Sequence, residues 1–337
     1  MKQKKLILRM KIKNKILLAY KFIGIKLLRK RQPFIVSWLL TYRCNYRCMY
    51  CNSWKIKTEE LATEKILSII DEMARAGTQI LHFTGGDPLL KDDIGLILDY
   101  CKRKKINTDI NSNPSSVIRK IDELVGLNLL TMSIDGPEEI HDFIRGRGSY
   151  RELMEAVKVV KQKNIKLRFS TVLSRYNLNA VDFILEKAKE LKIPVVFQPA
   201  RLCMLAGTEI NPIVSIEKDY KKAVSNLIIE KEKNKYIINS MSGLRHLYNW
   251  PRSAKIKCVN SLIVCRLQPN GEMYGCGRNA HINENAPNCL KLGFRRSFES
   301  LIPMNCRECW CASFVELNYL FSLNAGAILN VLKLDII

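Results

Sequence analysis

The 337-residue sequence lacks the long apolar run of a membrane-spanning or secreted protein. The longest apolar run in its first 33 residues extends only from Ile16 to Tyr20, too short for a bilayer span or a signal-peptide core. It also lacks low-complexity linkers and internal repeats, because its 16 Gly and 11 Pro are scattered. Hydrophobic and charged contents of 47% and 26% predict a soluble globular protein.

Acidic residues are absent from residues 1–33, which hold nine Lys and three Arg and thus about half of the net charge of +23. Ile16, Tyr20, Ile23 and Leu27 recur there at helical spacing. A basic amphipathic helix on an anionic membrane surface fits this pattern, and so does a docking helix with solvated basic residues. The segment lacks the interleaved aromatics of a nucleic-acid reader, so we expect no nucleic-acid partner.

The twelve Cys residues come without a secretory signal, which predicts a reducing cytosol where thiols serve metals or catalysis. We therefore expect a cytoplasmic protein, with peripheral contact at the inner membrane surface through residues 1–33. Three of the Cys residues lie between positions 44 and 51, and seven follow residue 257. Cys101 and Cys203 stand alone and are expected to be buried thiols.

Six apolar, strand-like runs alternate with segments of helical period. Their continuous apolar character predicts a parallel sheet that is buried on both faces. The expected strands are 34–41, 79–84, 106–111, 128–134, 166–172 and 193–198, and the expected helices are 59–76, 92–105, 115–126, 149–163, 179–191 and 217–234. Six such units fit both a doubly wound open sheet and a partial barrel.

Polar and glycine-rich motifs mark the ends of four expected strands. The first is a Cys motif, followed along the chain by GGDP (85–88), NSNP (111–114) and SIDG (133–136). Parallel α/β proteins bind ligands at the carboxyl ends of their strands. The four motifs therefore predict one composite site at that edge of the sheet.

Cys44, Cys48 and Cys51 form C-x-x-x-C-x-x-C, one thiol short of a closed four-ligand metal site. A zinc site would need a fourth Cys or His close by. His82 is the nearest candidate, but it lies within the second expected strand. Three thiolates can also hold a 4Fe–4S cluster whose fourth iron remains open to a ligand.

The run FIVSWLLTYRCNYRCMYC, followed by TGGDP and SIDG, resembles the radical S-adenosylmethionine (radical SAM) superfamily over about residues 34–235. The resemblance implies an α/β fold, a partial (β/α)6 TIM-like barrel, and an oxidoreductase or transferase. It implies that Cys44, Cys48 and Cys51 hold a 4Fe–4S cluster whose fourth iron binds SAM. An electron from this cluster would cleave SAM and give a 5′-deoxyadenosyl radical.

The resemblance also assigns cofactor contacts. Tyr50 matches the aromatic residue beside the adenine, and Gly85 and Gly86 match the glycine pair near the SAM amino group. The absence of a Cβ allows close backbone approach there. Asp87 stands where the family usually has Glu, one methylene longer.

Residues at or after two later strand ends complete the expected SAM site. Ser133 and Arg145 match residues that hold the ribose and the methionine carboxylate, and Arg suits a carboxylate because it donates two parallel hydrogen bonds. Asn111 lies at the third strand end, where ribose contacts are common in the family. Asp135 is interpreted as a structural turn residue.

The cysteine-rich region after residue 235 contains QPNGEMYGC, in which Asn270-Gly271 predicts a hairpin turn. A hairpin with Cys at its edge and a later C-x-x-C would bring four thiols together, as zinc and Fe–S sites both require. The spacing resembles the SPASM/twitch extension of radical SAM enzymes. That resemblance implies one or two auxiliary 4Fe–4S clusters. We favour one, because Cys311 follows the C-x-x-C pair at once and no Cys comes later; Cys265 and Cys311 are alternate ligands of that cluster or partial ligands of a second. The favoured ligands are Cys258, Cys276, Cys306 and Cys309.

Three parts are therefore expected: the basic segment 1–33, a radical SAM core over 34–235, and the extension with an apolar tail over 236–337. Gly277 stands where sulfatase-maturing relatives carry a general-base Asp, which argues against that reaction. The tail predicts a docking helix pair or a partner-binding segment. The resemblance implies a protein reductant such as a ferredoxin or flavodoxin.

The substrate stays open among a peptide, a lipid precursor and a sugar. The rival interpretation is a zinc-stabilised basic nucleic-acid-binding protein. It explains the charge and the C-x-x-C pair, but it leaves the strand-end motifs unexplained.

Overall fold

The structure is a computed structural model that describes residues 24, 25, 27, 31–204, 209–252, 256–277, 285–303 and 309–333. Its centre is one eight-stranded sheet with the order β6-β5-β4-β3-β2-β1-β7-β8. The strands are β1 (Ile35–Thr41), β2 (Ile80–Gly85), β3 (Asn107–Asn111), β4 (Leu129–Ser133), β5 (Leu167–Leu173), β6 (Val195–Pro199), β7 (Val264–Leu267) and β8 (Met273–Tyr274).

Helices follow most of the strands. The α-helices are α2 (Thr63–Ala76), α3 (Ile94–Arg103), α4 (Pro114–Arg119), α5 (Glu138–Arg145), α6 (Ser149–Gln162), α7 (Val181–Leu191), α8 (Glu217–Lys231), α9 (Met241–Leu247), α10 (Cys289–Leu292), α11 (Phe294–Glu299), α12 (Ala312–Phe321) and α13 (Ala325–Lys333). The 3-10 turns are η1 (Ser53–Lys55), η2 (Pro88–Leu90), η3 (Ile121–Leu124) and η4 (Leu178–Ala180).

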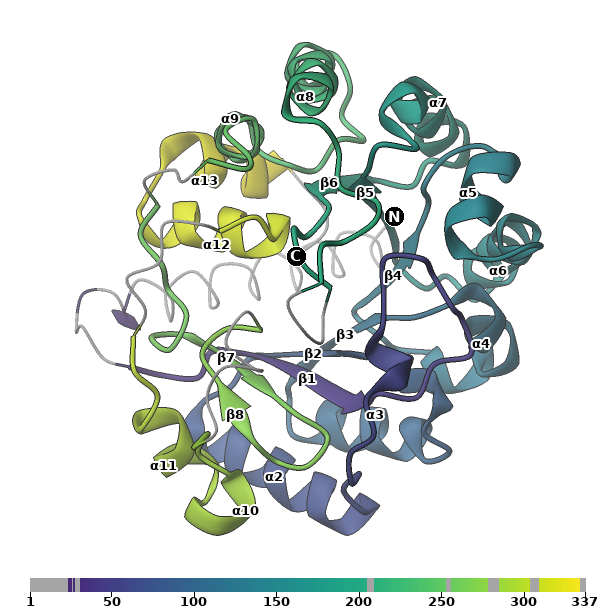
Figure 1. Cartoon of the computed structure of the whole chain (residues 1–337). Coiled ribbons are helices and arrows are strands. Elements are labelled where there is room, and N and C mark those ends of the chain that lie inside the picture. Colours follow the sequence, from purple (N-terminus) through teal and green to yellow (C-terminus); the bar gives the residue numbers. More distant parts are fainter. Residues whose placement is uncertain are drawn as a thin grey trace, which may run out of the picture.

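The strand order confirms a partial barrel. Strands β1 to β6 are parallel and each pairs with its neighbour in the chain, whereas a doubly wound sheet reverses its order partway. Figure 1 shows the sheet curving inside a ring of helices. The sheet stays open between β6 and β8. All six expected strands are confirmed.

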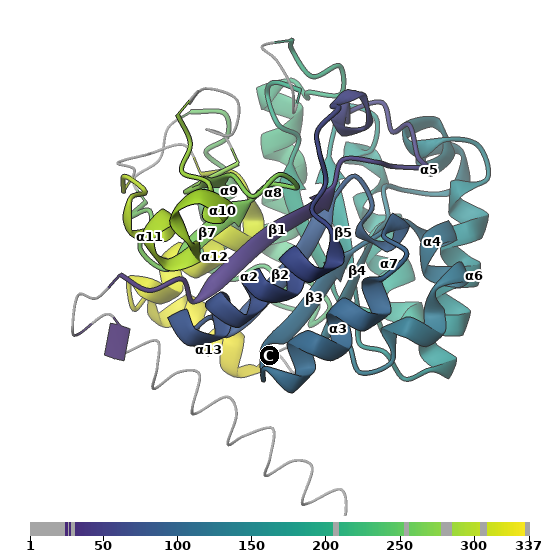
Figure 2. The ribbon, with the colours of Figure 1, turned by 90° about the horizontal axis from the view of Figure 1, so that it is seen from below.

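Helix packing explains why this curved sheet forms. Ile66, Ile70 and Met73 recur at helical spacing on α2 and are fully buried, in one apolar cluster with Trp38 of β1. The helix ends at Gly77, whose φ of +91° is the left-handed conformation that favours glycine at a helix C-terminus. Figure 2 shows α2 and α3 lying along the outer side of β1 to β3.

Three local expectations were wrong. The expected helix 115–126 is divided into α4 and η3. Helix α5 was not anticipated, because its eight residues form a short amphipathic segment directly after Pro137. Cys101 is buried as expected, but Cys203 is exposed, since it lies in the loop beyond β6 and not on a helix or strand face.

The C-terminal region continues the same sheet. Strand β7 pairs in parallel with β1, and β8 returns antiparallel to β7. The turn between them contains Gly271 with a φ of +84°, which confirms the expected hairpin. Helix α12 approaches β6, where the backbone N–H of Ala312 donates to Gln198 at 3.4 Å. The extension therefore lies at the open side of the barrel (Figure 1).

The apolar tail forms the expected helix pair, α12 and α13. Val315 and Ala327 are fully buried. Within the described part of the chain, no single helix is long and apolar enough to cross a membrane. The pair reaches that length and composition only when both helices are taken together, across a bend of 111°.

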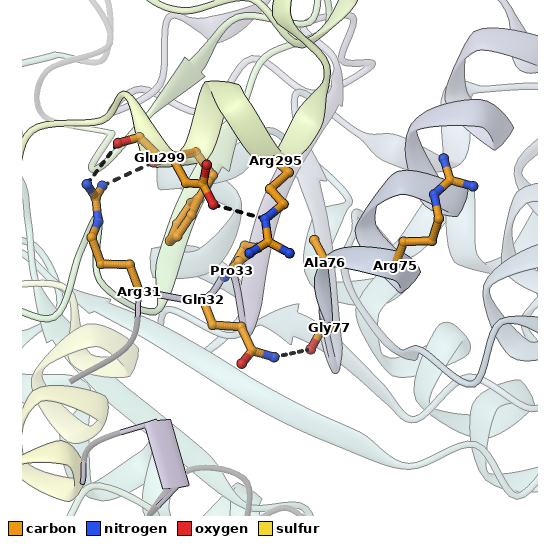
Figure 3. Close-up of a pocket in the computed structure, with 9 residues that line it drawn as sticks. Arg31, Gln32, Pro33, Arg75, Ala76, Gly77, Arg295 and Glu299 are labelled. Carbon is orange, nitrogen blue, oxygen red and sulfur yellow. Dashed lines mark hydrogen bonds and ion pairs between the residues drawn. The ribbon is translucent and has the colours of Figure 1, made fainter. Parts of the chain in front are cut away.

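Arg31, the first residue of the continuous stretch 31–204, forms hydrogen bonds with the extension. Its guanidinium donates to the carbonyls of Ser261 at 2.9 Å and Leu301 at 2.6 Å, and also to those of the residues at the end of α11. Nearby, Gln32 donates to the carbonyl of Gly77 at 3.1 Å (Figure 3). The small pocket of about 210 Å³ here lies at the amino ends of β1 and β2, the end that serves stability in barrels. Nearly all of segment 1–33 lies outside the described residues.

Candidate functional site

The three N-terminal Cys residues lie on the loop that leaves the carboxyl end of β1. The Cys44 thiol accepts hydrogen bonds from the Tyr46 backbone N–H at 3.4 Å and from Nδ2 of Asn113 at 3.2 Å. Cys51 lies 3.1 Å from the hydroxyl of Ser53. All three thiols are only partly buried. They are therefore held by polar neighbours at the edge of the sheet and are not absorbed into the core.

Burial raises the pKa of the Cys48 thiol to about 11. Burial also raises the pKa of Cys44, against the opposing hydrogen bond from the Tyr46 backbone. A group that binds these sulfurs as thiolates must therefore displace their protons.

Gly85 and Gly86 end β2 directly beside this loop. A Cβ on Gly86 would lie 2.1 Å from the carbonyl oxygen of Arg43, and one on Gly85 would lie 2.1 Å from that of Thr41. Gly85 also has a φ of +138°. The backbone N–H groups of Gly86 and Asp87 donate to these same carbonyls, both at 2.8 Å. The glycine pair thus lets two strand ends meet, and that contact fixes where the Cys loop begins.

Arg145, the last residue of α5, approaches the Cys loop. Its Nη1 lies 3.9 Å from the sulfur of Cys48, and its guanidinium carbon lies 5.4 Å from the centre of the Tyr50 ring. Its Nε donates to Oδ2 of Asp135 at 2.6 Å, and both residues are buried. The structure thus brings Cys48, Tyr50 and Arg145 together, with Asp135 holding the guanidinium.

The electrostatics around Arg145 keep it charged. Burial opposes the charge, but the Asp135 carboxylate, Tyr50 and Cys48 together outweigh it, so the pKa of Arg145 is raised. Nη2 of Arg145 and Oδ1 of Asp135 are buried without partners among the described residues. His141 accepts a hydrogen bond from the Asp135 backbone N–H at 3.1 Å, and burial lowers the pKa of His141 to about 3, so it is neutral. The unused Nη2 donor therefore suits an anionic ligand.

The remaining expected contacts lie along the same edge. Asp87 is fully buried, and its Oδ1 accepts from Ser112 Oγ at 2.7 Å and from the Leu89 backbone N–H at 3.1 Å. It thus links the ends of β2 and β3 and begins η2. Its Oδ2 has no partner among the described residues. Asn111 and Ser133 are the last residues of β3 and β4.

The described C-terminal Cys residues lie in three environments, and Cys311 is the exposed one. Cys265 and Cys289 are buried, and burial raises the pKa of both, to about 12 for Cys289. Cys265 therefore belongs to the apolar core. Cys258, Cys276 and Cys309 are partly buried, and Cys309 accepts from Asn318 at 3.6 Å. Cys306 lies outside the described residues.

A single-ion site has a different geometry from a cluster site. Among the described residues, no three Cys, His, Asp or Glu side chains converge on one point as ligands of one ion. Zinc needs four ligands around one ion. In a cubane each Cys thiolate binds its own iron, so the thiols need not converge. The partly exposed thiols and the unpartnered guanidinium donor accommodate an anionic cluster with a bound carboxylate.

The site is thus a partial parallel α/β barrel with thiols and a guanidinium at its carboxyl edge, an arrangement that fits a 4Fe–4S cluster. Residues 38–188, from β1 into α7, match the model of the radical SAM superfamily. The chain therefore contains a radical SAM domain over these residues, and members of that superfamily use a 4Fe–4S cluster and SAM.

Relatives and solved structures extend the likeness beyond this span. Fe-coproporphyrin III synthase of Methanosarcina barkeri is 26% identical over 211 residues, which cover 60% of this chain and 52% of that protein. This chain thus spans about half the length of that synthase. Mycofactocin maturase MftC of Mycobacterium tuberculosis is 24% identical over 273 residues, covering 77% of this chain and 68% of MftC.

The structure of Streptococcus suis SuiB bound to its precursor peptide SuiA superposes with a TM-score of 0.66 at 16% identity. The superposition covers 83% of this chain and 68% of SuiB. At that identity the likeness establishes the fold.

Sequence reasoning missed the positioning residue of the site. Asp135 was interpreted as a structural turn residue, yet its carboxylate holds Arg145. The sequence did contain a signal for this pair. Asp135 precedes Arg145 by ten residues in a strand–helix unit, so the two can pair once α5 folds back. Asn113 lies in the expected NSNP motif, but its hydrogen bond to Cys44 was not anticipated.

Proposed function

We propose that this protein is a radical SAM enzyme with one auxiliary cluster. Cys44, Cys48 and Cys51 would hold the catalytic 4Fe–4S cluster. The residues expected around SAM are Tyr50, Gly85, Gly86, Asp87, Asn111, Ser133 and Arg145. When bound, the reduced cluster and SAM supply a 5′-deoxyadenosyl radical that takes hydrogen from a substrate carbon.

The contact between Arg145 and the Cys loop carries this proposal. The Asp135 carboxylate orients the guanidinium toward Cys48 and leaves Nη2 as an unused donor. Such a donor matches a carboxylate, which the methionine part of SAM provides. The Tyr50 ring lies over the same guanidinium, with its centre 5.4 Å from the guanidinium carbon.

The extension over 236–337 would hold the auxiliary cluster through Cys258, Cys276, Cys306 and Cys309. The substrate class proposed from the relatives is a peptide, because SuiB binds a precursor peptide and MftC is named as a maturase. Electrons would come from a ferredoxin or flavodoxin. Contact with an anionic membrane surface through 1–33 belongs to the same proposal.

Anaerobic reconstitution with iron and sulfide, followed by dithionite reduction with SAM, tests the radical chemistry. We expect about eight irons per chain and formation of 5′-deoxyadenosine. In the Cys44/Cys48/Cys51→Ala triple variant we expect about four irons and no 5′-deoxyadenosine. Cys203→Ala is the matched control, since this exposed Cys lies outside the site, and it should retain both.

A zinc-loaded protein with no brown chromophore and no 5′-deoxyadenosine would refute the proposal. Salt-dependent nucleic-acid binding in the same preparation would then favour the zinc-stabilised binding protein.

A further inference from the structure

The inward face of the sheet carries a row of polar side chains at mid-strand level. Ser37 of β1 pairs with His82 of β2 and with Arg266 of β7, and His82 pairs with Asp109 of β3. Residues paired across a parallel sheet project from the same face. Trp38, the neighbour of Ser37, belongs to the apolar core beneath the helices. The row therefore projects into the barrel.

A second guanidinium enters the interior from β5. Arg168 pairs with Thr131 and donates to its hydroxyl through Nη2 at 2.9 Å. Two residues further along β5, Ser170 pairs with Ser133. At about 3.3 Å per residue, Arg168 lies about 7 Å below that edge of the sheet. It therefore faces the space beneath the proposed SAM site.

Both guanidiniums retain unused donors. Nε of Arg168 and Nε of Arg266 are buried and have no partner among the described residues. Buried donors are nearly always hydrogen-bonded in proteins, and an unpaired one on a charged group is costly. Two such donors on the inward face of one sheet point to a missing acceptor.

The charges of the interior agree with an anionic acceptor. Burial raises the pKa of Asp109 to about 6, against the opposing effects of Arg168 and Lys166, so at neutral pH this face holds the Asp109 carboxylate and the two guanidiniums of Arg168 and Arg266. Burial, reinforced by both arginines, lowers the pKa of His82 to about 3, so the imidazole is neutral. The row therefore keeps an excess of positive charge.

Gly277 provides the space that Arg266 occupies. A Cβ at position 277 would lie 2.2 Å from Nη1 of Arg266 and 2.9 Å from its guanidinium carbon. The glycine therefore leaves room for the guanidinium at the edge of the hairpin. Because the guanidinium is the end of a flexible side chain, an alanine here would move Arg266 without disturbing backbone.

We propose that Arg168 and Arg266 bind an oxyanion of the substrate, a carboxylate or a phosphate, inside the barrel beneath the radical site. The guanidinium fork matches both oxyanions through paired hydrogen bonds. The inference rests on the proposed function, because the bound molecule is the substrate of that reaction. The rival is that the thiolates of Cys276 and Cys311, which also act on Arg266, supply its counter-charge.

Thermal unfolding of the reconstituted full-length protein, measured anaerobically, tests the oxyanion site. The probes are succinate, inorganic phosphate and the neutral analogue succinamide, at constant ionic strength because the basic chain attracts anions weakly elsewhere. A ligand that binds only the native state raises the Tm with its concentration. We expect succinate or phosphate, and not succinamide, to raise the Tm, and the more effective oxyanion identifies the class.

Arg168→Gln and Arg266→Gln should each weaken this binding by about tenfold or more. Arg245→Gln is the matched control, since this exposed arginine lies on α9, and it should bind as the wild type does. Gly277→Ala should weaken binding with all charges retained. The iron content of all four variants should equal that of the wild type.

Equal Tm shifts in the wild type and in the Arg168→Gln and Arg266→Gln variants would overturn the inference. Loss of iron with unchanged oxyanion binding would also overturn it and assign the arginines to the auxiliary cluster. Failure of the proposed function is separate, because it appears as no 5′-deoxyadenosine from the wild type. Arginine-dependent oxyanion binding in that protein would keep the site and refute only the radical chemistry.

Discussion

The buried pair between Asp135 and Arg145 should dominate the local stability of the site. Nε of Arg145 lies 2.6 Å from Oδ2 of Asp135, and the side chains of Arg145 and Asp135 are 7% and 1% exposed. At charge centres about 4 Å apart and an effective dielectric constant of about 20, the attraction is about 4 kcal/mol. Removing one partner from a buried pair typically costs about 3–5 kcal/mol, because the other charge is left unpaired.

A double-mutant cycle measures this coupling. Asp135→Asn and Arg145→Gln should each lower the free energy of unfolding by about 3–5 kcal/mol. The loss of unfolding free energy in the double variant should be at least about 2 kcal/mol smaller than the sum of the losses in the two single variants. The matched control is the pair of Arg295 and Glu299, 2.9 Å apart, whose side chains are 60% and 51% exposed. Arg295→Gln and Glu299→Gln should each cost about 1 kcal/mol or less.

Urea unfolding of the full-length chain, kept reduced and followed by circular dichroism, supplies these energies. The slope with urea must stay constant across the variants for the midpoints to report stability. Strictly additive costs for Asp135→Asn and Arg145→Gln would refute the argument. A coupling energy no larger than that of the exposed Arg295 and Glu299 pair would also refute it. Either result means that the Asp135 carboxylate does not hold the Arg145 guanidinium.

Two further predictions concern the same edge of the sheet. Gly86→Ala should destabilise the chain by about 3 kcal/mol or more, since its Cβ would meet backbone atoms. The control is Gly95→Ala, whose Cβ would meet only the flexible Glu123 side chain, and it should change the free energy of unfolding by no more than about 1 kcal/mol. Urea midpoints compare the two, and equal costs would contradict the contact between strand ends. Asp142 accepts from the Tyr150 backbone N–H at 2.8 Å and joins α5 to α6, so Asp142→Asn should cost about 1 kcal/mol at pH 7. Burial opposes ionisation of Asp142, but its hydrogen bonds outweigh burial and lower its pKa. The stability difference between the wild type and Asp142→Asn should therefore be complete above about pH 5 and disappear as the pH falls through the lowered folded-state pKa. A stability difference that stays constant down to about pH 2 would contradict this prediction.

The strands and the Cys loop could be predicted because their signals are local. Each strand is a short apolar run that ends in glycine or polar residues, and such strand boundaries can be recognised without knowledge of the fold. The order of the sheet is not local. Periodicity left the barrel and the doubly wound sheet equally open, and the family resemblance, not the pattern, favoured the barrel.

The interior row could not be predicted because it depends on register. His82 appeared in the sequence only as a poor zinc ligand inside a strand. Pairing with Ser37 and Asp109 is what turns it toward the interior, and a shift of one residue would reverse its face. The pairing of Asp135 with Arg145 was missed for a similar reason, since Arg145 lies on α5, a helix that the sequence did not predict.

The extension completes the barrel interior as well as carrying thiols. Strand β7 supplies Arg266 to the inward row, and the Tyr42 hydroxyl, next to the Cys loop, donates to Gln268 of the hairpin at 2.6 Å. The sheet is therefore continuous across the expected boundary at residue 235, and β1 has neighbours from both parts. An oxyanion held at Arg266 would consequently contact the core and the extension at once, so that the shape of the hairpin bears directly on which substrates reach the radical site.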